Sequence, residues 1–302
     1  MRWQSAELTA AHLETPSART LTLHVPGWPG HLPGQHVDVR LTAPDGYQAV
    51  RSYSLAAPAD GETVVLTVQR VPDGEVSGYL VDDLPVGAQI EIRGPVGGWF
   101  VWNPDRGGAA LLIAGGSGIV PLAAMLRAHR NSADTNPFRL IYSLRDSADL
   151  YYRTELTAVL REPPGRRERA PGSGDRAAQS ARRPGVDDSA GRGETGRLDG
   201  LGGAAMSGRG SIALQEESHR SPGSGDVDVF CAFTRVAPPG SERPAGRLTA
   251  EEIVRYGIPP SPDVTCYVCG PTGFVEFVAG TLVSLGYDPG LIRTERFGPT
   301  GK

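Results

Sequence analysis

The chain has 302 residues, of which 39% are hydrophobic, and a formal net charge of −4 at pH 7. This length allows two domains with buried cores, and the acidic balance argues against a nucleic-acid-binding surface. No apolar run approaches the roughly 18 residues of a membrane span, and the first residues lack the apolar core of a signal peptide. We therefore expect a cytoplasmic protein with no membrane span.

From the N-terminus to about residue 103, short alternating runs are separated by turn residues such as Pro and Gly. The clearest runs are residues 19–25, 35–41, 63–69 and 88–93. Alternation with a period of two is typical of strands with one buried face, so this region predicts a small antiparallel barrel or sandwich.

The second region opens with an apolar run, Leu111–Ala114, followed by three glycines and a helical pattern. Gly115, Gly116 and Gly118 allow close approach of a ligand to the backbone, and the start of the next helix favours a phosphate. Pro121 suits the first helical turn. Because this proline occupies the third position of the Gly-x-Gly-x-x-Gly fingerprint, the pattern disfavours an ordinary Rossmann dehydrogenase.

The rest of the second region alternates strands and helices, which predicts a parallel sheet with right-handed crossovers. We expect strands at 138–143, 227–234, 265–269 and 291–297, and helices at 151–161, 249–256 and 273–285.

A polar segment at about 163–226 interrupts this alternation. It is rich in Gly, Arg, Ser, Ala and Pro, and the sequence of residues 171–175 recurs at 222–226. Such a composition cannot bury enough apolar surface to offset its ordering entropy. We predict that residues 171–221 are a disordered and dispensable insertion. The alternative is an arm that docks on the barrel or binds a partner.

Two short stretches in the first region contain groups suited to a flavin nucleotide. Residues 51–55 read Arg-Ser-Tyr-Ser-Leu, and residues 74–77 read Gly-Glu-Val-Ser. Arginine can neutralise a phosphate, tyrosine can stack on a planar ring, and a serine hydroxyl can hydrogen-bond a ring nitrogen.

Together with residues 93–100, the glycine turn, Cys269-Gly270-Pro271 and Glu295-Arg296-Phe297-Gly298, these stretches resemble the ferredoxin-NADP reductase superfamily. The similarity is to bacterial members without a fused ferredoxin, and the proline at 121 belongs to the family pattern. The resemblance implies a six-stranded antiparallel flavin-binding barrel at 1–103. A five-stranded parallel NAD(P)-binding domain then follows at 108–302.

The resemblance also implies roles for individual residues. Ser54, Cys269 and Glu295 are the expected catalytic residues, with Ser54 at the flavin N5 and Cys269 beside the nicotinamide. The expected FAD-binding residues are Arg51, Tyr53, Ser54, Gly74, Val76, Ser77 and Phe297. The expected NAD(P)-binding residues are Gly115, Gly116, Gly118, Pro121, Ser143, Arg145, Arg235, Gly270 and Pro271. The chain ends four residues after Gly298, from which we expect a short or mobile C-terminal lid.

Two other interpretations of these residues are weaker. Cys266 and Cys269 have the spacing of a redox dithiol or half a metal site, but residues three apart on a strand point to opposite faces. The six histidines show no paired ligand spacing, and we expect no metal site.

The expected function is hydride transfer from NAD(P)H to FAD, with electrons passed to a separate ferredoxin or oxygenase component. Three cysteines are too few for a four-cysteine iron–sulfur cluster. The alternatives are a flavin or ferric-chelate reductase and a non-catalytic flavin-binding subunit. We expect a monomer, and NADPH rather than NADH because Arg235 suits a 2′-phosphate, although Asp146 beside Arg145 opposes this.

Overall fold

The computed structural model describes residues 2–103, 105, 108–157 and 227–298. The segment 171–221, for which the sequence predicts a dispensable insertion, lies outside these residues, so that prediction is not tested by the structure. In the part of the chain that is described, no helix is long and apolar enough to cross a membrane.

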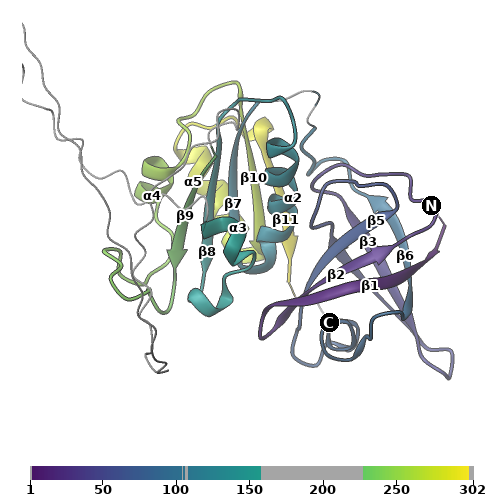
Figure 1. The fold of residues 1–302 in the computed structure, drawn as a ribbon. Coiled ribbons are helices and arrows are strands. Elements are labelled where there is room, and N and C mark those ends of the chain that lie inside the picture. The colour runs from purple at the N-terminus through teal and green to yellow at the C-terminus, as the bar shows by residue number, and fades with distance from the viewer. Residues whose placement is uncertain (1, 104, 106–107, 158–226, 299–302) are drawn as a thin grey trace, which may run out of the picture. The chain divides into compact units, whose positions relative to one another are not determined.

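The first region forms a six-stranded antiparallel sheet with the order β4-β3-β6-β1-β2-β5 (Figure 1). Its strands are β1 (Gln4–Thr15), β2 (Ala18–His24), β3 (His36–Thr42), β4 (Gln48–Ser54), β5 (Thr63–Gln69) and β6 (Gln89–Val96). The predicted alternation is present, because Leu21 and Leu23 of β2 are fully buried and pair with the buried Leu66 and Val64 of β5. A short helix, α1 (Glu75–Gly78), continues into a π-helical turn at Tyr79–Asp83, which the alternation did not reveal.

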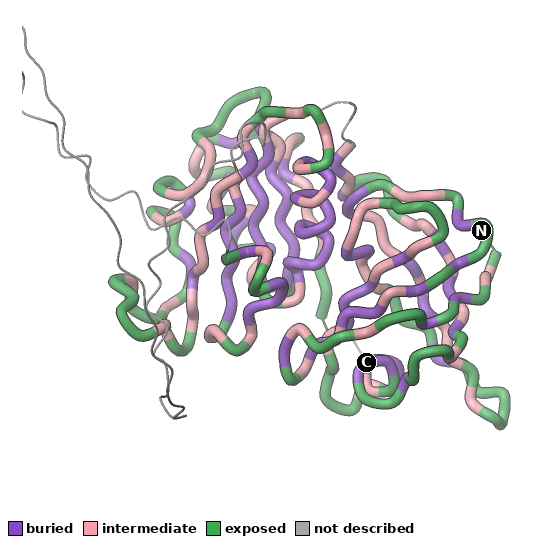
Figure 2. The backbone as a smooth tube through the Cα atoms, in the orientation of Figure 1, coloured by how far each residue is buried: buried purple, intermediate pink, exposed green. Residues whose placement is uncertain are grey.

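The second region forms a five-stranded parallel sheet with the order β11-β10-β7-β8-β9. Its strands are β7 (Ala109–Gly115), β8 (Phe138–Leu144), β9 (Val227–Phe233), β10 (Val264–Pro271) and β11 (Ile292–Phe297). The central strands are buried along nearly their whole length (Figure 2), as their unbroken apolar runs predict. The prediction of an antiparallel six-stranded sheet followed by a parallel five-stranded sheet is therefore confirmed.

Among the described residues, four helices cover the two faces of the parallel sheet. Residues of α2 (Ile119–Arg130) and α3 (Arg153–Thr157) pack in one core, and residues of α4 (Ala250–Tyr256) and α5 (Thr272–Ser284) pack in the other. Helix α4 begins with a capping box between Thr249 and Glu252, which satisfies two backbone N–H groups. Helix α3 begins two residues later than the sequence predicts, because Tyr152 has a left-handed backbone with φ of 53°.

Candidate functional site

A pocket of about 280 Å³ lies at the carboxyl ends of β7, β8 and β10, where parallel sheets bind ligands. The lining residues are Gln69, Gly115, Gly116, Ser117, Ser143, Leu144, Arg145, Asp149, Tyr151, Thr234, Pro271, Phe274 and Phe297. Most come from strand ends in the nucleotide-binding region, whereas Gln69 is the last residue of barrel strand β5.

The glycine turn gives this pocket its floor. A Cβ atom on Gly118 would lie 2.2 Å from the carbonyl oxygen of Cys269, so only glycine allows α2 to start this close to β10. Gly116 has φ of +56° and open space around its Cα, which leaves its backbone accessible to a ligand. On the neighbouring strands, the ring of Phe274 packs so closely on Gly115 and Gly270 that neither could carry a side chain.

The pocket contains six of the predicted ligand-binding residues, namely Gly115, Gly116, Ser143, Arg145, Pro271 and Phe297. Gly118, Pro121, Gly270 and Arg235 are not among its lining residues. Gly118 and Gly270 instead allow the backbone packing described above, and Pro121 is buried within α2. Arg235 contributes its backbone N–H, which donates to the carbonyl of Arg145.

Arg145 is the cation that lines the pocket, and it is held by Asp149. Its Nε and Nη2 donate to the two Asp149 carboxylate oxygens at 2.6 and 2.9 Å. Asp146, the neighbour that the sequence raised as an objection, turns away and accepts from the backbone N–H of Ala148. The 3₁₀ turn at Ser147–Asp149 therefore places Asp149 beside Arg145, rather than its sequence neighbour Asp146.

On the barrel, Arg51 and Tyr53 lie on the same face of β4, because they pair with Val39 and Val37 of β3. The Arg51 side chain is exposed, and the one hydrogen bond that the described residues give it is to the carbonyl of Val50. The Tyr53 ring is partly buried, and this burial raises the pKa of its hydroxyl to about 12. An exposed guanidinium beside a neutral aromatic ring fits a phosphate and a flat ring system.

The turn before α1 is compact for a specific reason. The Ser77 hydroxyl accepts from the backbone N–H of Val71 at 3.1 Å and donates to the carbonyl of Gly74 at 3.3 Å. A Cβ on Gly74 would lie 2.4 Å from that hydroxyl oxygen. The Ser77 side chain thus maintains the turn, and the groups left for a phosphate are the backbone N–H groups of the first turn.

Cys269 and Glu295 are brought together by strand register, since they pair directly in parallel strands β10 and β11. The Cys269 thiol lies 4.0 Å from Oε2 of Glu295, and Nδ1 of His36 lies 3.9 Å from Oε1. Burial raises the pKa of Glu295 to about 7 and the pKa of Cys269 well above its usual range. Burial also lowers the pKa of His36, with Asp38 opposing this shift. The cluster therefore holds exchangeable protons near neutral pH.

Ser54 joins this cluster through the barrel, because it is the register partner of His36 at the end of β4. Paired residues on neighbouring antiparallel strands place their Cβ atoms about 5 Å apart. No local sequence pattern indicates that His36 lies in this cluster. From the sequence alone, it is one of six histidines without a predicted role. Its neighbour Glu295 lies at the opposite end of the chain.

The two cysteines of the Cys-x-x-Cys stretch separate as strand geometry predicts. Cys266 packs in the core on the α4–α5 face of the sheet, and Cys269 packs in the core on the α2–α3 face. Both are free and buried. A dithiol between them is excluded by this arrangement.

Two family models match the chain in sequence. The oxidoreductase FAD-binding domain matches residues 5–101, and the oxidoreductase NAD-binding domain matches residues 112–195. The observations above agree with both cofactors: an exposed arginine, an aromatic ring and a helix start on the barrel, and a glycine-lined pocket on the parallel sheet.

Curated relatives match part of the chain. Component C of methane monooxygenase from Methylosinus trichosporium is 31% identical over 134 residues, covering 44% of this chain and 38% of the relative. The reductase subunit of an aromatic O-demethylase from Amycolatopsis is 38% identical over 136 residues, covering 44% and 40%. The chain thus matches less than half the length of these relatives.

Solved structures match the fold over nearly the whole chain. Amycolatopsis cytochrome P450 reductase GcoB gives a TM-score of 0.68 at 21% identity, covering 99% of this chain and 71% of that one. A ferredoxin NADP⁺ reductase from Neisseria gonorrhoeae with bound FAD and NADP gives 0.65 at 17% identity, covering 98% and 99%. The two family models show that the chain carries an oxidoreductase FAD-binding domain and an oxidoreductase NAD-binding domain, and its fold matches that of ferredoxin-NADP reductases.

Proposed function

We propose that this chain accepts hydride from NAD(P)H onto FAD and passes the electrons to a separate ferredoxin or oxygenase component. One observation carries the proposal: the cluster of Cys269, Glu295 and His36 links strand β10, whose last residue Pro271 lines the glycine pocket, to barrel strand β3, on which His36 pairs with Ser54. Hydride transfer requires such a meeting point, because donor and acceptor must be in near contact.

The barrel residues would bind and orient the flavin. Arg51 and the backbone N–H groups of the first turn of α1 would hold its phosphates, and the Tyr53 ring would pack against its ring system. Ser54 would position the ring by a hydrogen bond. When bound, FAD supplies the chemistry that accepts two electrons as hydride and releases them singly.

The residues of the parallel sheet would position the nicotinamide and manage the proton. Cys269 would form an uncharged wall, because its buried thiol stays protonated. Glu295 would hold a proton on its carboxylate near pH 7 and exchange it with solvent through His36. Neither residue needs to act as a nucleophile, since hydride transfer proceeds without a covalent intermediate.

The choice of acceptor is supported by the relatives and by the cysteines. The matched relatives are named as component C of methane monooxygenase and as the reductase subunit of an aromatic O-demethylase. In this chain, the three cysteines are too few for a four-cysteine cluster, and Cys266 and Cys269 are committed to opposite cores.

The test uses the purified protein loaded with FAD. We expect a yellow protein whose flavin band bleaches on mixing with NADH or NADPH, and faster turnover with a [2Fe–2S] ferredoxin than with free flavin or ferric chelates. A protein that stays colourless after FAD is added contradicts the proposal. If NAD(P)H bleaches the flavin band but turnover is faster with free flavin than with ferredoxin, the protein is a flavin reductase. If the protein binds flavin and NAD(P)H does not bleach it, the protein is a non-catalytic subunit.

A further inference from the structure

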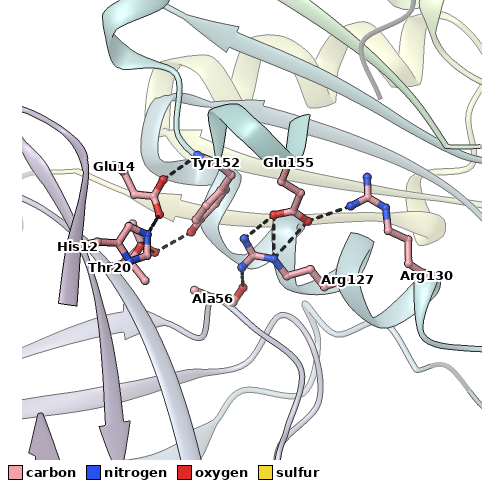
Figure 3. Close-up of polar contacts among 9 residues, drawn as sticks. His12, Glu14, Thr20, Ala56, Arg127, Arg130, Tyr152 and Glu155 are labelled. Atoms are coloured by element: carbon pink, nitrogen blue, oxygen red, sulfur yellow. Dashed lines mark hydrogen bonds and ion pairs between the residues drawn. The ribbon is translucent and has the colours of Figure 1, made fainter. Parts of the chain in front are cut away.

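A cluster of polar side chains joins the barrel to the parallel sheet away from the pocket (Figure 3). At its centre, Arg127 of α2 uses three of its donor groups at once. Nη1 donates to the backbone carbonyl of Ala56 at 2.5 Å, and Nε and Nη2 donate to the Glu155 carboxylate at 3.1 and 2.6 Å. The guanidinium also lies 4.4 Å over the ring of Tyr152.

The hydrogen bond between Arg127 and Ala56 joins the flavin-binding part of the candidate site to the dinucleotide-binding part. Ala56 follows Ser54, the last residue of β4, by two positions, and its N–H donates to the carbonyl of Val65. Helix α2, which carries Arg127, begins directly after the glycine turn of the pocket. A hydrogen bond between Arg127 and Ala56 thus links the flavin strand to the helix behind the dinucleotide turn.

Tyr152 adds a second anchor to the same link. Its N–H donates to Oε2 of Glu14 at 2.9 Å, and its hydroxyl donates to Oγ1 of Thr67 at 2.7 Å. Its left-handed backbone is strained and persists only where the surroundings determine it. Because Tyr151 lines the pocket, the barrel contacts of Tyr152 also fix one pocket wall.

We propose that Arg127 is a positioning residue for hydride transfer, which holds the Ser54 end of β4 at a set distance from the glycine turn. The proposal rests on the site assignment made above. The guanidinium of Arg127 is suited to this positioning role because its planar, delocalised fork can donate to a carboxylate and a carbonyl together. A lysine ammonium is a point charge instead. A displacement of about 1 Å between reacting groups can slow a reaction by about a hundredfold. A small increase in the distance between the Ser54 end of β4 and the glycine turn should therefore be measurable as a slower rate.

Arg127→Lys is the test variant, and Arg130→Lys is its matched control. Lysine keeps a positive charge beside Glu155, which protects folding, but cannot span both acceptors in one plane. Arg130 binds the same Glu155 at 3.0 Å, and the described residues give its side chain no hydrogen bond to the barrel. In the FAD-loaded protein, we expect Arg127→Lys to slow flavin reduction at saturating NAD(P)H by about tenfold or more. In Arg127→Lys, the dissociation constants of FAD and NAD(P)H should change by less than about threefold. In Arg130→Lys, the rate of flavin reduction and both dissociation constants should stay within about twofold of wild type.

A second readout does not depend on activity. In the FAD-free protein, amide hydrogen exchange at residues 55–57 should be faster in Arg127→Lys and unchanged in Arg130→Lys. Unchanged reduction and exchange in Arg127→Lys would overturn the proposal, as would loss of FAD or an equal effect of both variants. If wild type is not reduced by NAD(P)H at all, the proposed function fails, and the exchange experiment still reports separately on the link.

Discussion

The Glu295 carboxylate lies 3.9 Å from Nδ1 of His36, although the two residues come from opposite ends of the chain. One is on the last strand of the parallel sheet and the other is on barrel strand β3. Each side chain is about three-quarters removed from solvent, with exposed fractions of 26% for His36 and 25% for Glu295. Burial raises the pKa of Glu295 and lowers the pKa of His36, so an acid and a base share one site that is largely removed from solvent.

Glu295→Gln should change how stability depends on pH. Glu295 has a folded pKa of about 7, above its ordinary value of 4.5, so the folded state binds this proton more tightly than the unfolded state. The resulting stabilisation is complete below pH 4.5 and is lost as pH rises through 7. Between pH 4.5 and 8, we expect the free energy of unfolding from thermal melts to fall by about 3 kcal/mol less in Glu295→Gln than in wild type. Glu276→Gln, at an exposed carboxylate on α5, is the control, and an equal slope in all three proteins would contradict the prediction.

Cys269→Ala should slow flavin reduction on the order of tenfold while FAD stays bound, because the thiol packs where the nicotinamide would approach. Cys266→Ala removes a similar sulfur from the opposite core and should leave the rate within about twofold. Stopped-flow absorbance measures both rates. Cys269 should also resist iodoacetamide in the native protein, since it is 1% exposed and its thiol pKa is raised. A covalent adduct on Cys269 during turnover would refute a positioning role.

Asp149→Asn should shift nucleotide preference towards NADPH. In the pocket, Asp149 accepts from Nε and Nη2 of Arg145 and would repel a 2′-phosphate, whereas it can accept from a ribose hydroxyl. Removing its charge should raise the ratio of kcat/KM for NADPH to that for NADH by about tenfold, which corresponds to about 1.4 kcal/mol. Arg145→Leu should lower the ratio. Arg235→Ala, outside the pocket lining, should leave it unchanged, and a larger effect there than at Arg145 would restore the sequence-based assignment.

Gly118→Ala and Gly116→Ala should separate stability from binding. The new methyl at position 118 would overlap the carbonyl of Cys269, so we expect the free energy of unfolding to fall by about 3 kcal/mol or more. At position 116 the methyl points into open space, and only the positive φ costs stability, about 1 kcal/mol. Urea unfolding should therefore show a larger loss of free energy of unfolding for Gly118→Ala than for Gly116→Ala. NAD(P)H titration should show weaker binding in Gly116→Ala, whose methyl occupies the pocket floor.

The parts of the site that the sequence predicted are those set by local pattern. The strand and glycine turn at 111–118 follow from an apolar run and three glycines. The separation of Cys266 from Cys269 needs only the period of a strand. These features depend on few residues close together in sequence.

The missed parts depend on segments that are distant in sequence. Gln69 enters the pocket from the barrel, and His36 reaches Glu295 only after both sheets have formed. Asp149 replaces Asp146 at Arg145 because a single 3₁₀ turn reverses the chain, and propensity does not resolve such a turn. The contact of Arg127 with a backbone carbonyl has no sequence signature, because any residue at position 56 supplies the same oxygen.

Strand β4, which carries Arg51, Tyr53 and Ser54, is one of the two edge strands of its sheet. In the described part of the chain, its outer side has no ladder partner, and an isolated bridge between Leu55 and Leu66 lies just beyond its end. Unpaired edge strands are templates for pairing with other chains, and so promote aggregation. A flavin lying along β4 would cover that edge, so newly made protein that has not acquired FAD carries the greatest risk of precipitation. Cofactor supply during expression then governs not only how active a preparation is but how much of it stays in solution.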